Sequence, residues 1–169
     1  KPDRRQRQMC IRDRYNLYVI EDAAQAMMAK YKNNHLGTFG HLSAFSFHET
    51  KNYSSGGEGG LLVINDAKFK ERAEIIREKG TNRSQFFRGM VDKYSWVDIG
   101  SSYLMSELQS AYLWNQIQNA ESMNAARIEA WNYYHRQLSA MHRKGFIEIF
   151  QCPKNLSLIH ISEPTRPLS

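Results

Sequence analysis

The sequence predicts an α/β fold, and three observations support that class. Short apolar runs that end in polar residues are typical of buried strands, and three of them occur in the first half of the chain. Longer stretches with apolar residues near a period of 3.6 are typical of amphipathic helices and fill much of the second half. The two kinds of segment are mixed along the chain without internal repeats, which indicates helices packed on a sheet.

The three apolar runs give the predicted strands. Residues 17–20 precede Glu21 and Asp22, as expected of a parallel strand with acids at its carboxyl end. Residues 43–47 and 61–64 are the second and third strands. Functional side chains of α/β sheets gather at the carboxyl ends of strands, which draws attention to Asp22 and to the segment after the second strand.

Four helical segments are predicted around these strands. Residues 23–30 are small and helix-favouring and indicate a short helix. Residues 67–79 place apolar side chains among charges, with Gly80 as a C-cap. A long helix begins after Ser106 as N-cap, and residues 122–142 continue helically.

The remaining segments predict turns, loops and one further strand. Gly37 and Gly40 bracket a turn, and the Gly- and Ser-rich residues 50–60 are expected to be irregular. Residues 81–102 are polar and aromatic without a clear period, and loops of this length are usually functional or disordered. Alternation of apolar and other residues over 146–150 predicts a strand.

Composition and charge disfavour several classes of protein. The hydrophobic share of 41% can fill a core, but no apolar run reaches the ~18 residues of a membrane span. Two cysteines without metal-ligand spacing fit a reducing, cytoplasmic setting and indicate no metal site. The formal charge of +6 is concentrated in the first 14 residues, where six Lys or Arg accompany two Asp. A nucleic-acid-binding module, which needs a basic surface patch, is therefore a minor alternative.

The two ends differ from the sequence between them. Residues 1–14 have no periodicity, and residues 157–169 continue no earlier pattern. Within them, QMCIRDR and LIHISEPTRPL resemble peptides translated from sequencing-adapter DNA, with ordinary disordered tails as the alternative. We expect both ends to be non-native extensions and the informative sequence to span about 15–156.

Three elements carry side chains suited to chemistry: Glu21-Asp22-Ala-Ala-Gln25, Ser46-Phe-His-Glu-Thr-Lys51 and Gly56-Gly-Glu-Gly-Gly60. Taken singly, they would be a strand cap, a solvated lysine and a turn. In this order and spacing they resemble the sugar aminotransferases of the DegT/DnrJ/EryC1/StrS family, which use pyridoxal phosphate. The resemblance covers about residues 15–150. It is strongest in VIEDAAQA, GTFGHLSAFSFHETKN and GGEGGLLVINDAKFKERAEIIREKG.

This resemblance implies a fragment of a fold-type I aminotransferase dependent on pyridoxal phosphate. Residues 15–104 would be the C-terminal part of the large mixed-sheet domain that binds the cofactor. Residues 105–156 would be the long helices that lead into the small domain. Family members are more than twice this length. The chain alone is therefore expected to be inactive and, with uncovered sheet edges and apolar faces, prone to aggregate.

The resemblance also assigns cofactor-binding residues. Lys51 would bind pyridoxal 5′-phosphate as a Schiff base and later carry a proton during amino transfer. Asp22 would keep the pyridine nitrogen protonated, Gln25 would lie near the ring hydroxyl, and Ser46 would donate to the phosphate. A related branch that deoxygenates sugars has histidine in place of this lysine, so Lys51 favours transamination.

A further phosphate ligand is expected from a neighbouring subunit, because the family's active sites lie across a homodimer interface. Many members place an asparagine there in a Gly-x-Asn-Tyr pattern. The matching stretch here is Gly100-Ser-Ser-Tyr103, with Ser102 at the asparagine position. A serine hydroxyl can also donate to phosphate.

The substrate implied by the resemblance is a nucleotide-linked keto sugar, with an amino acid such as glutamate as donor. The stretch GTNRSQFFRGMVDKYSWVDIGSSYL resembles one branch, whose members aminate carbon 4 of a thymidine-diphosphate-linked 4-keto-6-deoxy sugar for enterobacterial common antigen. Within it, Arg83, Arg88, Lys93 and Tyr94 suit a diphosphate and a stacked base. A solvated loop with a few packed aromatics is the alternative for this stretch. For the whole protein, the alternative is a non-catalytic homologue that binds cofactor or a partner without turnover.

Overall fold

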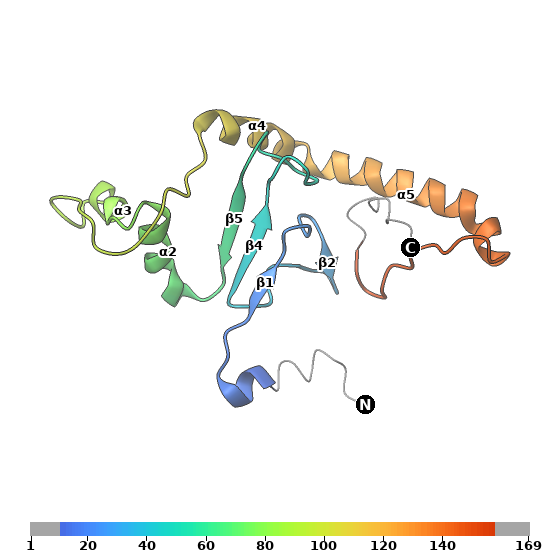
Figure 1. The fold of residues 1–169 in the computed structure, drawn as a ribbon, viewed down its shortest axis with the longest axis horizontal. Coiled ribbons are helices and arrows are strands. Elements are labelled where there is room, and N and C mark those ends of the chain that lie inside the picture. Colours follow the sequence, from blue (N-terminus) through green and yellow to red (C-terminus); the bar gives the residue numbers. More distant parts are fainter. Residues whose placement is uncertain (1–10, 158–169) are drawn as a thin grey trace.

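The computed structural model describes residues 11–157, and at its centre is a three-stranded sheet. Strands β1 (Ile20–Asp22), β4 (Leu42–Ser46) and β5 (Gly60–Ile64) lie side by side in Figure 1. β1 runs parallel to β4, whereas β5 is antiparallel to it. The sheet is therefore mixed, and the α/β prediction is confirmed.

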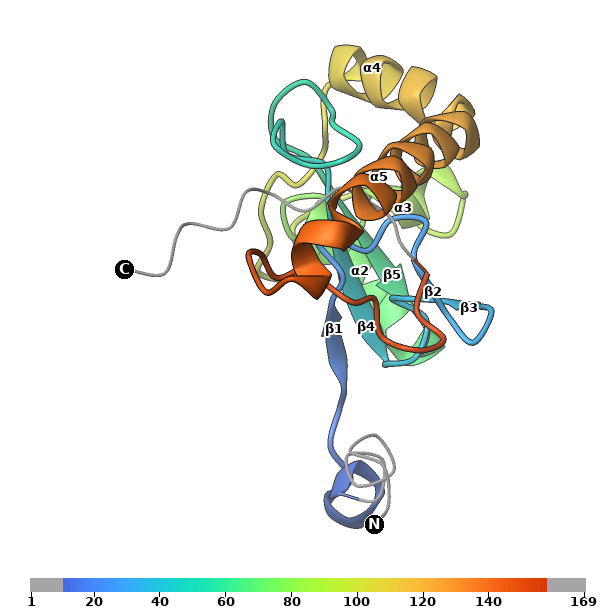
Figure 2. The same ribbon diagram turned by 90° about the vertical axis from the view of Figure 1, so that its right-hand side faces the viewer.

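The other elements flank this sheet. They are the antiparallel pair β2 (Lys30–Tyr31) and β3 (Asn34–His35), the short helix η1 (Ala67–Phe69), and helices α2 (Lys70–Arg77), α3 (Arg83–Phe87), α4 (Glu107–Gln118) and α5 (Ala120–Arg143). α4 crosses one end of β4 and β5, α5 continues outward from it, and α2 and α3 lie on the other side of the sheet (Figures 1 and 2). Among the described residues, every helix is too short or too polar to span a membrane.

Several predicted boundaries are confirmed by local hydrogen bonds. Ser106 forms a capping box with Gln109: its hydroxyl accepts from the Gln109 backbone N–H at 3.3 Å, and the Gln109 side chain accepts from the Ser106 N–H at 3.2 Å. The predicted C-cap Gly80 is wrong: the C-cap of α2 is Glu78, and Gly80 follows two residues later at a φ of +77°, where its N–H donates to Ile75 O at 2.8 Å. Helices α2 and α5 cover the segments with helical periodicity.

The prediction of a helix over residues 23–30 is wrong. Two successive turns replace it, closed by hydrogen bonds from Ala26 N–H to Ala23 O and from Ala29 N–H to Ala26 O. The Ala23 N–H itself donates to Ala44 O of the neighbouring strand. Eight residues are too few to form a stable helix by propensity alone, so contacts with the sheet decide the local structure.

Three further expectations need correction. The first strand begins at Ile20 rather than at residue 17 and includes both acids. The loop predicted over 81–102 contains α3. Residues 146–150 form no strand, because the backbone there bonds to the His142 side chain, which accepts from Ile149 N–H at 3.3 Å.

The core lies where helices α4 and α5 pack against the loop that follows β4. Four buried side chains form it: Phe47, Tyr53, Leu113 and Ala120. Partly buried methionines and Ile117 pack around them. The loop after β4 is therefore part of the most tightly packed region among the described residues.

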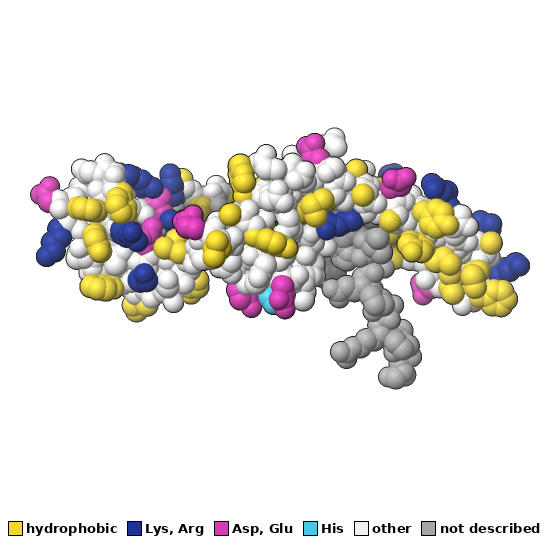
Figure 3. All heavy atoms as spheres, turned by 90° about the horizontal axis from the view of Figure 1, so that it is seen from above, with side chains coloured by type: hydrophobic (Ala, Val, Ile, Leu, Met, Phe, Trp, Pro, Cys, Tyr) yellow, Lys and Arg dark blue, Asp and Glu magenta, His cyan; other side chains and the backbone are white. Residues whose placement is uncertain are grey.

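Large apolar side chains remain exposed along α4 and in the second half of α5. Leu108 is 85% exposed and Trp114 63% exposed, both on α4. On α5, Tyr133 and Tyr134 are also exposed. Figure 3 shows hydrophobic side chains gathered at the end of the molecule to which α5 extends. Exposed apolar surface of this kind is typical of a face that another element or subunit covers.

Candidate functional site

The register of the sheet brings two predicted site residues to the same face. Asp22, the last residue of β1, pairs with Ala44 of β4. Paired residues of neighbouring strands point to the same side, and side chains alternate along a strand. Ser46, two residues after Ala44, therefore lies on the face of the sheet that carries Asp22.

Lys51 is carried by a loop that closes on itself after β4. The Ser55 N–H and hydroxyl both donate to Phe47 O, at 2.8 and 3.1 Å, and Ser55 is almost fully buried. The Lys51 N–H donates to His48 O at 2.9 Å, which fixes a turn at the base of its side chain. The His48 ring also accepts the Thr50 N–H at 3.1 Å. A segment predicted to be irregular is thus held by specific hydrogen bonds.

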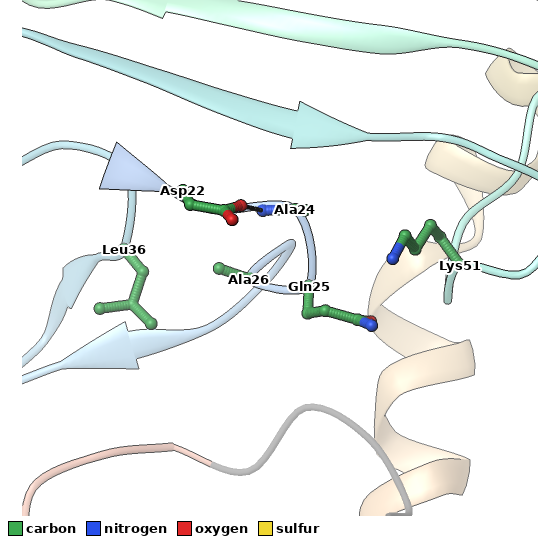
Figure 4. Close-up of a pocket in the computed structure, with 6 residues that line it drawn as sticks. All are labelled: Asp22, Ala24, Gln25, Ala26, Leu36 and Lys51. Carbon is green, nitrogen blue, oxygen red and sulfur yellow. Dashed lines mark hydrogen bonds between the residues drawn. The ribbon is translucent and has the colours of Figure 1, made fainter. Parts of the chain in front are cut away.

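The Lys51 and Asp22 side chains line the same pocket. It is lined by Asp22, Ala24, Gln25, Ala26, Leu36 and Lys51. The pocket volume of about 460 Å³ lies within the ~300–1,000 Å³ of small-molecule sites. In Figure 4 the Lys51 amine points across the open space toward the turns that carry Asp22 and Gln25.

The three polar groups of this pocket come from two elements. Asp22 ends β1 and Gln25 belongs to the turns that follow it, and the Asp22 carboxylate accepts the Ala24 N–H at 3.1 Å. Lys51 comes from the loop after β4. Asp22 and Gln25 are exposed, and Lys51 is half-buried. The arrangement presents an anion, an amide and an amine to one small molecule.

Ser46 and Ser102 lie outside the residues that line this pocket. The Ser46 hydroxyl accepts the His48 N–H at 3.3 Å, at the start of the lysine loop. Ser102 forms an isolated β-bridge with Glu78 after α2, and its side chain is exposed. The family resemblance implies that Ser102 donates to the phosphate in a neighbouring subunit, so its role stays a prediction.

A second, smaller pocket collects two of the residues predicted to bind substrate. Arg83 and Tyr94 line it, and its volume is about 160 Å³. The other lining residues are Glu78, Lys79, Thr81, Trp96 and Leu104. The Arg83 guanidinium lies 3.7 Å from the Glu78 carboxylate. Two cations, one carboxylate and two aromatic rings therefore line this cavity, and its use by a substrate stays a prediction.

Arg88 and Lys93 are placed differently. Arg88 donates two hydrogen bonds of 2.8 Å to Glu74, which is the bidentate geometry of a strong ion pair. Arg88 holds the pKa of the Glu74 carboxyl below its ordinary value, mainly by this hydrogen bonding. Lys93 is exposed and lies outside both pockets. The fold thus gives Arg88 a structural partner between α2 and α3.

The sequence analysis missed Arg127 of α5, whose guanidinium donates to Asn52 O at 2.7 Å, directly after Lys51. The spacing of residues along the predicted helix could have indicated Arg127. Arg127 lies four residues after Met123, on the face of the helix that predicts burial. A charged residue within such a face marks a specific polar contact.

Comparison with known proteins finds a family match over most of the chain. A model of the DegT/DnrJ/EryC1/StrS aminotransferase family matches residues 6–162. The dTDP-3-amino-3,4,6-trideoxy-alpha-D-glucose transaminase of Streptomyces venezuelae is 30% identical over 133 residues, which cover 79% of this chain and 31% of that protein. The GDP-perosamine synthase of Escherichia coli O157:H7 is 32% identical over 127 residues, which cover 75% and 32% of the two chains.

A solved structure shows the same fold. A DegT DnrJ EryC1 StrS aminotransferase from Brucella abortus matches with a TM-score of 0.73 at 27% identity. The match covers 92% of this chain and 38% of that one. The chain spans about a third of the length of the curated relatives it matches. The fold-type prediction is therefore confirmed.

Proposed function

The chain belongs to the DegT/DnrJ/EryC1/StrS aminotransferase family, and we propose that it forms the lysine-bearing part of an enzyme that aminates nucleotide-linked keto sugars. The observation that carries the proposal is the shared pocket of Lys51 and Asp22. The cofactor of such an enzyme is pyridoxal 5′-phosphate. This group supplies an electron sink that stabilises negative charge on the substrate carbon.

The residues of the pocket fit that cofactor chemically. An amine is needed to hold the aldehyde, and Lys51 supplies one. A carboxylate is needed beside the pyridine nitrogen to keep its proton, and Asp22 supplies it. Gln25, on the same wall of the pocket, suits the ring hydroxyl. Ser46, on the Asp22 face of the sheet, suits the phosphate.

Each residue then has one task in amino transfer. Lys51 would hold the cofactor through its amine and would carry the proton that leaves the donor carbon. Asp22 maintains the positive charge on the ring nitrogen through the transfer. The same two residues serve the second half of the reaction, in which the proton and the amine pass to the keto sugar.

The acceptor is a nucleotide-linked keto sugar, and the donor is an amino acid such as glutamate. Two relatives are named for dTDP- and GDP-linked sugars, which supports a nucleoside-diphosphate acceptor without fixing its base. We favour a dTDP-linked 4-keto-6-deoxy sugar, aminated at carbon 4 for cell-surface antigen. Arg83, Tyr94 and Lys93 remain the proposed contacts to nucleotide and diphosphate, and Arg88 is the weakest of the four.

The complete enzyme is proposed to be a homodimer. Exposed apolar side chains on α4 and α5 suit burial against a partner or against the rest of the protein. Ser102, outside the Lys51 pocket, would reach the phosphate of the neighbouring subunit. A cytoplasmic location and the absence of nucleic-acid and membrane partners stay predictions.

Covalent trapping tests the proposal directly. The complete protein is incubated with pyridoxal phosphate, reduced with borohydride, digested and mapped by mass spectrometry. The added cofactor mass is expected on the peptide that contains Lys51 and is expected to be absent from Lys51→Ala. Lys70→Ala, which removes an exposed lysine on α2, serves as the matched control and should still be labelled. Label distributed over surface lysines in all three proteins would refute the assignment.

The alternative, a non-catalytic homologue, predicts a different pair of results. It would be labelled on Lys51 yet would convert no amino acid donor. A single-turnover assay with glutamate separates the two, because an active enzyme changes the absorbance of its bound cofactor when the donor is added. We favour the enzyme because Lys51 and Asp22 share one pocket.

A further inference from the structure

Helices α4 and α5 hold the three residues that follow Lys51, one after another. Arg127 Nη2 donates to Asn52 O at 2.7 Å. The Tyr53 hydroxyl donates to Ala120 O at 3.1 Å. The Gln116 side chain both donates to and accepts from the backbone of Ser54. Its amide donates to Ser54 O at 2.7 Å, and its oxygen accepts from Ser54 N–H at 3.1 Å.

Of these contacts, the one made by Arg127 is charged, and it lies beside the buried Tyr53 ring. Its guanidinium carbon lies 5.2 Å from the centroid of the Tyr53 ring, which is 2% exposed. Burial raises the pKa of the Tyr53 hydroxyl, and the charge of Arg127 opposes that shift. Among the described residues, three buried polar atoms here lack a hydrogen-bond partner: Asn52 Nδ2, Asn124 Oδ1 and Arg127 Nη1.

Such a cluster is costly for stability alone. A buried polar atom without a partner costs about 1–3 kcal/mol, so the unpartnered Nη1 offsets part of what the hydrogen bond to Asn52 O contributes. The guanidinium instead fixes the position of the backbone that follows Lys51. The hydrogen bond from Nη2 fixes the direction of the Asn52 carbonyl, and therefore the path of the chain that leaves Lys51.

We propose that Arg127 is a positioning residue for Lys51, and that it makes the placement of the cofactor-binding amine depend on the docking of α5. The inference rests on the proposed function of Lys51. On the N-terminal side the Lys51 N–H is bonded to His48 O, and on the C-terminal side Asn52 O is bonded to α5. Released from Arg127, the Lys51 side chain would sample directions away from Asp22.

Substitutions in the complete enzyme test this role. Arg127→Met keeps an apolar stem over Tyr53 and removes the charge and the donor to Asn52 O. We expect kcat to fall about 10- to 100-fold, the size of effect that a misplacement near 1 Å produces, with the KM of the amino donor little changed. The pH midpoint of the bound cofactor's visible absorbance should also move. Arg127→Lys, which keeps the charge and one donor, should recover part of both losses.

Two controls separate positioning from general destabilisation. Arg136→Met makes the same change at an exposed position of α5 and should match the wild type. Glu74→Gln weakens the ion pair with Arg88 between α2 and α3, away from the Lys51 loop, and should lower the melting temperature without moving the absorbance midpoint. If Arg127→Met fails to fold, Arg127→Lys carries the test by itself. A lysine variant with the wild-type kcat and midpoint would overturn the proposal.

Backbone hydrogen exchange gives a readout that needs no activity. The peptide over residues 48–56 should exchange faster in Arg127→Met than in wild type and in Arg136→Met. Wild-type protein that traps no cofactor on Lys51 would overturn the proposed function, and the positioning role with it. Wild-type trapping combined with unchanged exchange, kcat and midpoint in Arg127→Met would overturn the positioning role alone.

Discussion

Two adjacent acids at the end of β1 have different tasks. The Glu21 carboxylate accepts three backbone N–H groups: those of Gly37 at 2.9 Å and of Phe39 and Gly40 at 2.6 Å each. Asp22, on the opposite face, accepts only the nearby Ala24 N–H among the contacts of the described residues and lines the proposed cofactor pocket. Glu21 therefore holds the turn that covers one face of the sheet, and Asp22 is left available for its proposed role on the other.

This division predicts opposite outcomes for two similar substitutions. Asp22→Asn should lower kcat about 100-fold, the size of effect seen when one preorganised electrostatic contact is lost, and leave the melting temperature nearly unchanged. Glu21→Gln should instead lower the free energy of unfolding by about 1–3 kcal/mol and spare kcat in the folded fraction. Steady-state kinetics and urea denaturation of both variants measure the difference. Equal losses of kcat would contradict the separation of roles.

Arg83 and Arg88 also differ, although both lie in the stretch predicted to bind substrate. Arg83 lines the second pocket, whereas both terminal nitrogens of Arg88 bond to Glu74. Arg83→Met should raise the KM for the nucleotide sugar about tenfold or more, because a charged hydrogen bond contributes about 1.5–3 kcal/mol. Arg88→Met should leave that KM within about twofold. A larger rise in KM for Arg88→Met would show that Arg88 does bind the substrate.

At the scale of elements, the ion pair between α2 and α3 predicts a pH dependence. Arg88 lowers the pKa of Glu74 in the folded protein. A carboxyl with a lowered folded pKa stabilises above its unfolded pKa, and that stabilisation is lost as pH falls through the folded pKa. Arg88→Met should therefore be less stable than wild type at neutral pH and equal to it in acid. Urea denaturation across this range checks the sign, and a difference that grows in acid would contradict it.

The start of α4 predicts a further stability effect. Ser106 and Gln109 exchange hydrogen bonds in a capping box, and α4 carries the Gln116 contact to the lysine loop. Ser106→Ala should cost about 1 kcal/mol of unfolding free energy. Ser106→Asp, which keeps an acceptor at the N-cap, should retain most of it. Loss of stability in both variants would place the effect elsewhere than in the cap.

The elements also show how far sequence alone reaches. Lys51 and Asp22 could be predicted to meet because parallel strands present their carboxyl ends at one edge. The helix expected over residues 23–30 failed because a hydrogen bond from Ala23 to β4 outweighs weak local propensity. The strand over 146–150 failed because its backbone bonds to His142. Arg127 and Asn52 are 75 residues apart, and only the docking of α5 brings them together.

At the scale of the whole molecule, uncovered apolar surface is the dominant feature. Large side chains on the sheet and on α4 and α5 are exposed, including Ile20 at 70% and Leu108 at 85%. The 169-residue chain made alone should therefore self-associate and bind a hydrophobic dye. The complete protein should elute as a dimer with low dye binding. Light scattering distinguishes these outcomes, and a stable, dye-free monomer of the chain alone would contradict them.

The pocket lined by Lys51, Asp22 and Gln25 is open on one side in this chain. One wall carries Asp22 and Gln25, the opposite loop carries Lys51, and all three face open space. A crystal structure of the complete protein with pyridoxal phosphate would test this arrangement most directly. We predict a covalent bond from Lys51 Nζ to the cofactor and a hydrogen bond from the pyridine nitrogen to the Asp22 carboxylate. A cofactor bound elsewhere, or a ring nitrogen that contacts a residue other than Asp22, would contradict the assignment.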